Sequence, residues 1–218
     1  MEADAKGLFI AIDGIHGCGK TTVVDHLARY LGDKGYSVTV TREIGGSPLG
    51  DKIREFFDSI EEDDDALASL LLVLAARAAH VNQLIRPSLA QNKVVITDRF
   101  TPSTFVYQYY CVEELSRQQE LLDTVKRFNN FATAGLSPDL TIILDVPAEV
   151  GLNRKGLAQS LGRWERKALE YHQKAREGYL YFAHLEHWAI VKADRPLEAV
   201  LEEVKQLVTL FLSSLAKI

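Results

Sequence analysis

The strongest constraint on this chain is a glycine-rich loop near the N-terminus, at residues 14–22. The sequence of this loop is GIHGCGKTT, which fits the pattern G-x-x-x-x-G-K-T. An apolar run at 8–12 precedes the loop and predicts a buried strand, and the apolar spacing of 23–31 predicts a helix after it. A strand, a loop of this pattern and a helix in this order predict a phosphate-binding loop.

The residue types in this loop each have a physical reason. Glycines let the backbone turn tightly, so that successive N–H groups point at one anion, and the helix N-terminus adds partial positive charge. Lys20 is expected to reach the β- and γ-phosphates, and the Thr21 hydroxyl is expected to ligate Mg²⁺. We therefore expect a nucleoside triphosphate with magnesium to contact Gly14, Ile15, His16, Gly17, Cys18, Gly19, Lys20, Thr21 and Thr22.

Composition bounds the class of protein. The 218 residues are 47% hydrophobic and 25% charged, which predicts one globular domain over 1–218. The net charge of −5 gives no reason to expect nucleic acid as a partner. Two cysteines are too few for a disulfide framework, so a reducing, cytoplasmic setting is expected. No purely apolar run reaches the roughly 20 residues that span a bilayer, so no membrane association is expected.

Predicted strands and helices alternate along the chain. This alternation predicts an α/β fold, a parallel sheet with helices on both faces. Residues 155–163 break the pattern with glycines and basic residues, which predicts a mobile basic flap. After the strand at 8–12, strands are predicted at 37–41, 93–97, 140–145 and 188–191. After the helix at 23–31, helices are predicted at 49–57, 66–90, 118–134, 147–154, 164–182 and 196–215.

Charged residues stand in informative places. Asp98 and Arg99 follow a predicted strand; beside a phosphate loop, an acid there is typical of a second magnesium anchor, and Arg99 could hold a second phosphate. The alternative is a surface ion pair. Arg42 and Glu43 end another strand, at the sheet edge where α/β proteins bind ligands. Arg77 lies in an apolar helix, where it either extends to the surface or faces a polar cleft.

Nine segments, taken in order, form a pattern that covers nearly the whole chain. They are FIAIDGIHGCGKTT (9–22), TREIGGSPLG (41–50), IR (53–54), ARAAH (76–80), DRF (98–100), FATAGLSPDL (131–140), LDVP (144–147), RWE (163–165) and RPL (195–197). Together they resemble the thymidylate (dTMP) kinases. The resemblance implies the P-loop nucleoside monophosphate kinase fold: three layers, a five-stranded parallel sheet and a flexible lid, here at about 153–166. It also implies transfer of the γ-phosphoryl group of ATP to dTMP in dTTP biosynthesis, with Mg²⁺, by a homodimer.

The resemblance also implies roles for individual residues. Lys20, Asp98 and Arg99 would be catalytic, with Thr21 and Asp98 at the metal, and Arg154 and Arg195 would lie near the adenine. Gly17 stands where some members carry a catalytic arginine, which leaves the lid arginines, and Arg163 is favoured over Arg154 and Arg166. Positions that contact or surround dTMP correspond to Arg42, Glu43, Arg54, Val73, Arg77, Arg99, Thr104, Tyr107 and Gln108.

The chain departs from this family at a few positions that bear on the acceptor. His16 replaces an acidic residue, and Val73 replaces a phenylalanine that stacks on the thymine. Tyr109 or Tyr110, which replace glycines, could supply the missing ring. A kinase for another nucleoside monophosphate, such as dUMP or a purine deoxynucleotide, and a non-catalytic nucleotide-binding protein are the alternatives. A GTP-dependent switch is disfavoured, because the guanine motif N-K-x-D does not occur.

Overall fold

The computed structural model describes residues 7–59, 65–112, 119–156 and 169–215. Five parallel strands form one sheet in the order β2-β3-β1-β4-β5. The predicted five-stranded parallel sheet is therefore confirmed. The strands are β1 (Leu8–Asp13), β2 (Val38–Arg42), β3 (Val94–Asp98), β4 (Leu140–Asp145) and β5 (Ala189–Lys192).

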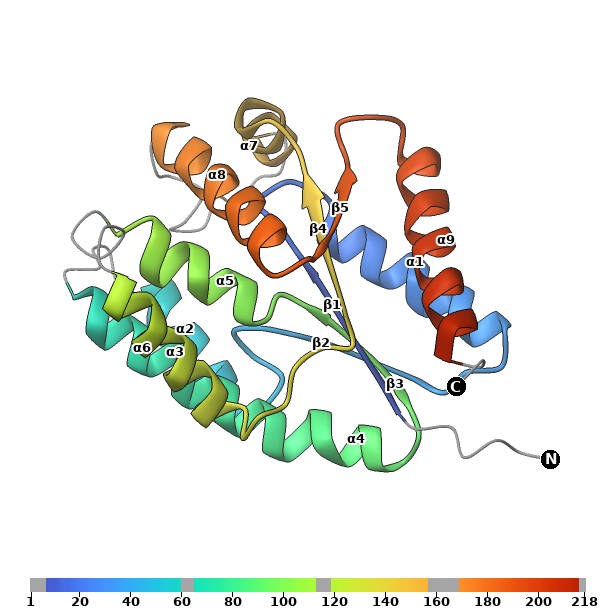
Figure 1. Ribbon diagram of the computed structural model, residues 1–218, viewed down its shortest axis with the longest axis horizontal. Coiled ribbons are helices and arrows are strands. Elements are labelled where there is room, and N and C mark those ends of the chain that lie inside the picture. Colours follow the sequence, from blue (N-terminus) through green and yellow to red (C-terminus); the bar gives the residue numbers. More distant parts are fainter. Residues whose placement is uncertain (1–6, 60–64, 113–118, 157–168, 216–218) are drawn as a thin grey trace.

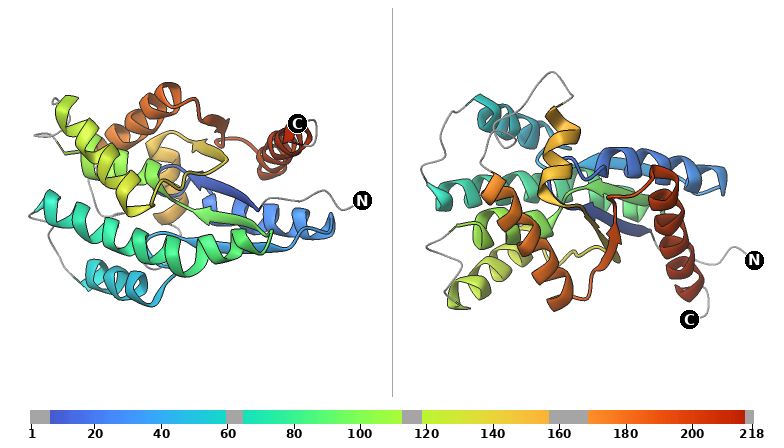
Figure 2. Two further views of the ribbon diagram at one scale, coloured as in Figure 1. Left: turned by 60° about the horizontal axis from the view of Figure 1, so that its bottom comes forward. Right: turned by 90° about the horizontal axis from the view of Figure 1, so that it is seen from above.

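Helices cover both faces of this sheet (Figure 1). On one face α1 contacts β1, β2 and β3 and lies beside α9, which contacts β5; on the other, α4 contacts β3 and α8 contacts β4 and β5 (Figure 2). The α-helices are α1 (Lys20–Asp33), α2 (Pro48–Ser59), α3 (Ala66–His80), α4 (Arg86–Ala90), α5 (Thr101–Phe105), α6 (Gln119–Ala132), α7 (Ala148–Gly156), α8 (Leu169–Leu185) and α9 (Leu197–Leu215), and the π-helices are η1 (Val81–Ile85) and η2 (Val106–Tyr110).

Strand β1 is the centre of the core. It is buried on both sides, as expected of a strand in the middle of a parallel sheet. Ile10 and Ile12 belong to the cluster that includes the buried face of α1, whereas Phe9 packs with Val81 and Ile85 on the opposite face. The alternation of side chains along the strand therefore joins both helical layers to one sheet.

The segment Ala66–Ala90 is helical throughout, as predicted, with the π-helix η1 between α3 and α4. The Asp65 side chain caps α3 by accepting hydrogen bonds from the amides of Leu67 and Ala68. In the described part of the chain, this is the one helical stretch that is long and apolar enough to cross a membrane, and half of its most apolar window is buried inside the fold. It is the core helix of the domain, since Val81 and Ile85 pack against the sheet.

Two parts of the chain differ from the sequence prediction or lie beyond it. Helices α5 and η2, at 101–110, were not predicted, because each has only five residues and shows no helical periodicity. The lid expected at about 153–166 falls mostly on residues 157–168, which lie outside the described residues, as do Arg163 and Arg166.

The strand register brings charged side chains to one edge of the sheet. Ile12 pairs with Asp98 across β1 and β3, and Arg42 pairs with Asp98 across β2 and β3. Strand β1 ends at Asp13, next to the phosphate-binding loop. The carboxyl ends of three strands therefore meet where ligands bind in open α/β sheets.

Candidate active site

The loop at 14–19 connects β1 to α1, and its glycines are required by geometry. Gly14 and Gly17 have φ angles of 141° and 74°, which side chains rarely adopt. A Cβ atom on Gly17 would collide with the carbonyl group of Gly151 in α7, and one on Gly14 would lie 2.5 Å from the carbonyl oxygen of Leu144. The loop therefore cannot carry an arginine at position 17.

Lys20 is held at the centre of this loop. Its Nζ donates to the carbonyl oxygens of Gly14 at 3.1 Å and Ile15 at 2.9 Å, and it lies 3.6 Å from Sγ of Cys18. The side chain is buried, so its positive charge is little screened by water. The loop thus places a cation, together with the N-terminus of α1, where the phosphate groups of a nucleotide are expected.

Thr21 and Asp98 lie side by side at the start of α1 and the end of β3. The Thr21 hydroxyl donates to Oδ2 of Asp98 at 2.8 Å. Both are hard oxygen ligands, and Mg²⁺ is commonly held by one or two such groups together with phosphate oxygens and water. Among the described residues, no group of three or more His, Cys, Asp or Glu could hold a metal ion by itself. The Thr21 and Asp98 pair therefore fits a nucleotide-bound magnesium ion.

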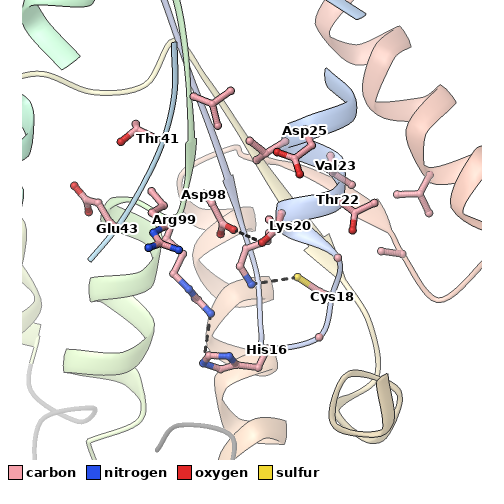
Figure 3. A pocket seen from close by; sticks show the side chains of 18 of the residues that line it. His16, Cys18, Lys20, Thr22, Val23, Asp25, Thr41, Glu43, Asp98 and Arg99 are labelled. Atoms are coloured by element: carbon pink, nitrogen blue, oxygen red, sulfur yellow. Dashed lines mark hydrogen bonds between the residues drawn. The ribbon is translucent and has the colours of Figure 1, made fainter. Parts of the chain in front are cut away.

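Two cavities meet at this edge of the sheet. The larger, of about 1020 Å³, runs along the phosphate-binding loop and reaches Arg154, Arg195 and Leu197. The smaller, of about 140 Å³, lies beyond it, between α2, α3 and η2. Figure 3 shows His16, Lys20, Asp98 and Arg99 directed into the larger cavity. Both cavities are lined by His16, Glu43, Arg54 and Arg99, which therefore lie at their junction.

The structure brings together most of the predicted site residues. Three of the described ones line neither cavity. Thr104 is fully buried behind Arg77. Gly14 and Ile15 contact Lys20 through their carbonyl groups. The larger cavity is lined by Gly17, Cys18, Gly19, Lys20, Thr21, Thr22, Arg42, Asp98, Arg154 and Arg195 in addition to the shared residues. The smaller cavity is lined by Val73, Arg77, Tyr107 and Gln108 in addition to the shared residues.

Arg99 has the most constrained position of these residues. Its φ of 74° is unusual for a residue with a side chain, and such strain is typical of functional sites. The backbone is fixed on both sides, since the Arg99 amide donates to the Ile12 carbonyl and the Thr97 hydroxyl donates to the Arg99 carbonyl. Its guanidinium lies over the Tyr107 ring, 5.4 Å from the ring centre. Burial raises the pKa of Tyr107 to about 12, so this phenol stays neutral.

Glu43 supports the wall of the smaller cavity through a buried ion-pair network. Its Oε2 accepts from Nε and Nη2 of Arg77, at 2.8 and 2.6 Å, and its Oε1 lies 3.1 Å from Nδ1 of His80. Arg77 Nη1 also donates to Thr104 at 2.7 Å and to Asn129. Burial acts to raise the pKa of Glu43, but the Arg77 charge and the His80 hydrogen bond outweigh it and lower that pKa. Arg77 is thus neither at the surface nor unpaired.

The aromatic residue beside Val73 differs from the one that the sequence suggested. Tyr109 is buried in the core against Phe182, and Tyr110 packs on Tyr181, so neither lines the smaller cavity. The suggestion that Tyr109 or Tyr110 replaces the missing ring is wrong, because η2 turns Tyr107 and Gln108, and not the next two residues, toward this cavity.

Phe57 of α2 lines the smaller cavity instead. It forms a small apolar cluster with Ile53, Val73 and Ala76. Phe57 was not among the predicted site residues, although the apolar spacing of 53 and 57 on one face of α2 indicated that it is buried.

Asp13, Ser103 and Tyr179 were also missed. The Tyr179 hydroxyl donates to Asp13 Oδ1 at 2.7 Å, and the two residues are 166 positions apart in the sequence. The Ser103 hydroxyl donates to the same carboxylate at 2.9 Å. Asp13 follows the apolar run of β1 directly, and an acid buried at a strand end was the available signal; nothing in the local sequence around Tyr179 indicates its partner.

The fold and the paired cavities define a class of protein. A glycine-rich loop with its lysine, a hydroxyl and carboxylate pair for magnesium, and arginines at the junction of two cavities are the parts of a P-loop phosphotransferase. The thymidylate kinase family model matches residues 12–204, which is most of the chain. The chain belongs to the thymidylate kinase family.

Individual relatives agree with this assignment. The thymidylate kinase of Carboxydothermus hydrogenoformans is 42% identical over 200 residues, which cover 92% of this chain and 96% of the relative. That of Geotalea daltonii is 44% identical over 189 residues, covering 83% and 85%. The crystal structure of thymidylate kinase from Ehrlichia chaffeensis superposes with a TM-score of 0.72 at 29% identity, covering 93% of this chain and 98% of that one.

Proposed function

We infer that this protein is a dTMP kinase, which transfers the γ-phosphoryl group of ATP to dTMP and gives ADP and dTDP. The observation that carries this function is the junction of the two cavities. Lys20 and the loop amides lie on one side, the apolar wall with Tyr107 and Gln108 lies on the other, and Arg54 and Arg99 stand between them. Membership of the thymidylate kinase family supports dTMP as the acceptor.

The donor is held in the larger cavity. The loop amides, the N-terminus of α1 and the Lys20 ammonium bind the β- and γ-phosphates of ATP. The purine end lies toward Arg154, whose Nη2 donates to the Ala193 carbonyl at 3.0 Å, and toward Arg195, which pairs with Glu203. Thr21 and Asp98 would hold Mg²⁺, which would neutralise phosphate charge when bound.

The acceptor is held in the smaller cavity. Its base lies against the apolar wall, its phosphate faces Arg54 and Arg99, and Tyr107 packs beneath the sugar and disfavours a 2′-hydroxyl. An oxygen of the acceptor phosphate attacks the γ-phosphorus, the bond to the β–γ bridging oxygen breaks, and ADP leaves. The protein mainly positions the two polyanions and neutralises their charge. We assign the remaining cation, which the loop cannot supply at Gly17, to Arg163, outside the described residues.

A panel of acceptors tests this function. ADP formation from ATP is measured with dTMP, dUMP, UMP, dGMP and other monophosphates in turn. We expect kcat/KM to be highest for dTMP and higher for deoxyribonucleotides than for ribonucleotides. A preference for dUMP or a purine deoxynucleotide would overturn the acceptor but not the reaction. Absence of monophosphate-dependent ADP formation would favour a non-catalytic nucleotide-binding protein.

We also propose that the chain acts as one domain, forms a homodimer and works in the cytoplasm. Large apolar side chains are exposed on the adjoining helices α3 (Leu67 and Leu71) and α6 (Phe128 and Phe131), which supports burial of this face against a second copy. Both cysteines are free, which suits a reducing compartment. Sedimentation of the wild type and of Leu71→Glu tests the dimer: the variant should be a monomer.

A further inference from the structure

The carboxylate of Asp13 is the centre of a buried hydrogen-bond network behind the junction of the two cavities. It is fully buried at the end of β1 and acts only as an acceptor. Besides the amide of the next residue in the chain, its donors come from the end of β3, from the start of α5 and from α8. They are the amides of Gly14, Phe100 and Ser103, at 2.8, 3.2 and 3.1 Å, the hydroxyls of Ser103 and Tyr179, at 2.9 and 2.7 Å, and Nη1 of Arg99, at 3.4 Å.

The Tyr179 hydroxyl connects this network to Arg99. It donates to Asp13, accepts from Nη1 of Arg99 at 3.1 Å, and lies 3.0 Å from the Ser103 hydroxyl. Burial first, and then the Asp13 charge, raise the pKa of Tyr179 well above its usual value, so the hydroxyl keeps its proton. It can therefore donate to the carboxylate and accept from the guanidinium at the same time.

The contacts of Arg99 are divided between its two terminal nitrogens. Nη1 contacts Asp13, the Gly14 carbonyl, Ser103 and Tyr179, whereas Nη2 contacts His16 at 3.5 Å. His16 and Arg99 both line both cavities. One edge of the guanidinium is thus fixed by the protein, and the other faces the junction.

We propose that Tyr179 is a positioning residue for Arg99: with Asp13 and Ser103, its hydroxyl fixes the Nη1 edge of the guanidinium so that the Nη2 edge meets the acceptor phosphate. This inference rests on the proposed function. Because the arginine is oriented before the ligand arrives, less side-chain entropy is lost when the phosphate binds. It also ties the position of α8 to the phosphate site, since Tyr179 lies on that helix.

Tyr179→Phe removes only the hydroxyl and keeps the ring in the core. We expect kcat/KM for dTMP to fall about tenfold, the effect of losing one hydrogen bond to a charged group, while KM for ATP stays within about twofold. Ser103→Ala, which removes the other hydroxyl that contacts Nη1, should show the same selectivity. Tyr181→Phe on the same helix is the matched control, because this half-exposed residue packs away from the site and should leave both substrates unaffected.

A double-mutant cycle with Arg99→Lys separates positioning from general stability. If Tyr179 acts through Arg99, Tyr179→Phe should have less than about a twofold further effect on kcat/KM for dTMP in the Arg99→Lys background. If the two substitutions lower kcat/KM for dTMP independently, so that their factors multiply in the double variant, the proposal is overturned. The proposal would also be overturned if Tyr179→Phe melts at a lower temperature but has normal kinetic constants. Equal losses in kcat/KM for dTMP and for ATP would overturn it as well.

These outcomes are distinct from a failure of the proposed function. If the wild type prefers another nucleoside monophosphate, dTMP is the wrong acceptor, and the same variants measured with the preferred acceptor still decide whether Tyr179 acts through Arg99. If the wild type transfers phosphate to no monophosphate, both proposals are overturned.

Discussion

The donor and acceptor halves of the site are built in different ways. The larger cavity is formed around the backbone of the phosphate-binding loop, where Gly14 and Gly17 are required by geometry and the variable positions carry His16 and Cys18. The smaller cavity is formed by side chains, and its wall depends on the buried pair of Glu43 and Arg77. One half presents main-chain amides that most substitutions leave intact, and the other presents side chains that a single substitution changes.

This difference explains where the chain departs from its family. Side chains at the non-glycine positions of the loop leave its backbone amides in place, so a residue such as His16 can stand there. A substitution in the acceptor half changes the surface that the base meets, as Val73 does, and must be accommodated by neighbours such as Phe57.

The largest effect is expected for Lys20, whose side chain lies at the centre of the phosphate-binding loop. Lys20→Ala should lower kcat by about a thousandfold or more, because the cation that meets the β- and γ-phosphates is lost. Lys34→Ala, which removes an exposed lysine just beyond the C-terminal end of α1, is the control and should keep full activity. Near-normal turnover of a folded Lys20→Ala protein would mean that the loop does not hold the donor phosphates.

In the acceptor half, the largest effect should be on stability. Arg77→Met leaves the Glu43 carboxylate buried without its cation, so unfolding in urea at pH 7 should show a loss of about 3–5 kcal/mol. Lys126→Met, which breaks the partly exposed pair with Glu186, should cost no more than about 1 kcal/mol.

The stability of the wild type and the stability of Arg77→Met should change with pH in opposite directions. In the wild type the pKa of Glu43 is lowered below 4.5, so its contribution is complete above pH 4.5 and is lost as the pH falls through the lowered value. In Arg77→Met burial is no longer offset by Arg77, so protonation of Glu43 should make the variant more stable at pH 5 than at pH 7. A variant that simply follows the wild-type profile would show that Arg77 does not control the charge of Glu43.

Arg99 tests the junction between the halves. Arg99→Met should lower kcat/KM for dTMP about a hundredfold, because a charge-assisted contact to the transferred or accepting phosphate is lost. Calorimetric binding of ATP alone should change little, since we expect Lys20 and the loop amides, and not Arg99, to hold the donor phosphates. If Arg99→Met weakens the binding of ATP as much as the binding of dTMP, Arg99 belongs to the donor half instead.

The donor half is easier to predict from the sequence than the acceptor half, for a physical reason. The loop, Lys20 and Thr21 are local in sequence, and the chemistry of a backbone cradle is visible in its glycines. The acceptor half depends on contacts between distant segments, such as Glu43 with Arg77. Periodicity predicts that a residue is buried but not what it meets, so Thr104 was expected at the ligand although it lies behind Arg77.

The same limit applies to the order of the strands and to short helices. Strand β3 lies between β1 and β2. This order depends on how the helices that connect the strands pack on the sheet, and no local sequence pattern indicates it. The five-residue helices α5 and η2 are too short to show periodicity, and the direction of their side chains decides that Tyr107 lines the cavity while Tyr109 enters the core.

The smallest effect, and the sharpest test of the acceptor wall, is expected at Val73. Because Phe57 already packs beside it, Val73→Phe should crowd the wall and lower kcat/KM for dTMP by about threefold to tenfold. The double variant Phe57→Val with Val73→Phe should regain most of this loss, since it moves the ring from α2 to α3 without changing the total side-chain volume. In the wild type, dTMP should exceed dUMP by only about tenfold, because one methyl group in an apolar pocket gives weak discrimination. If Val73→Phe alone tightens dTMP binding, the wall has room for a second ring, and Phe57 does not occupy the place of the missing one.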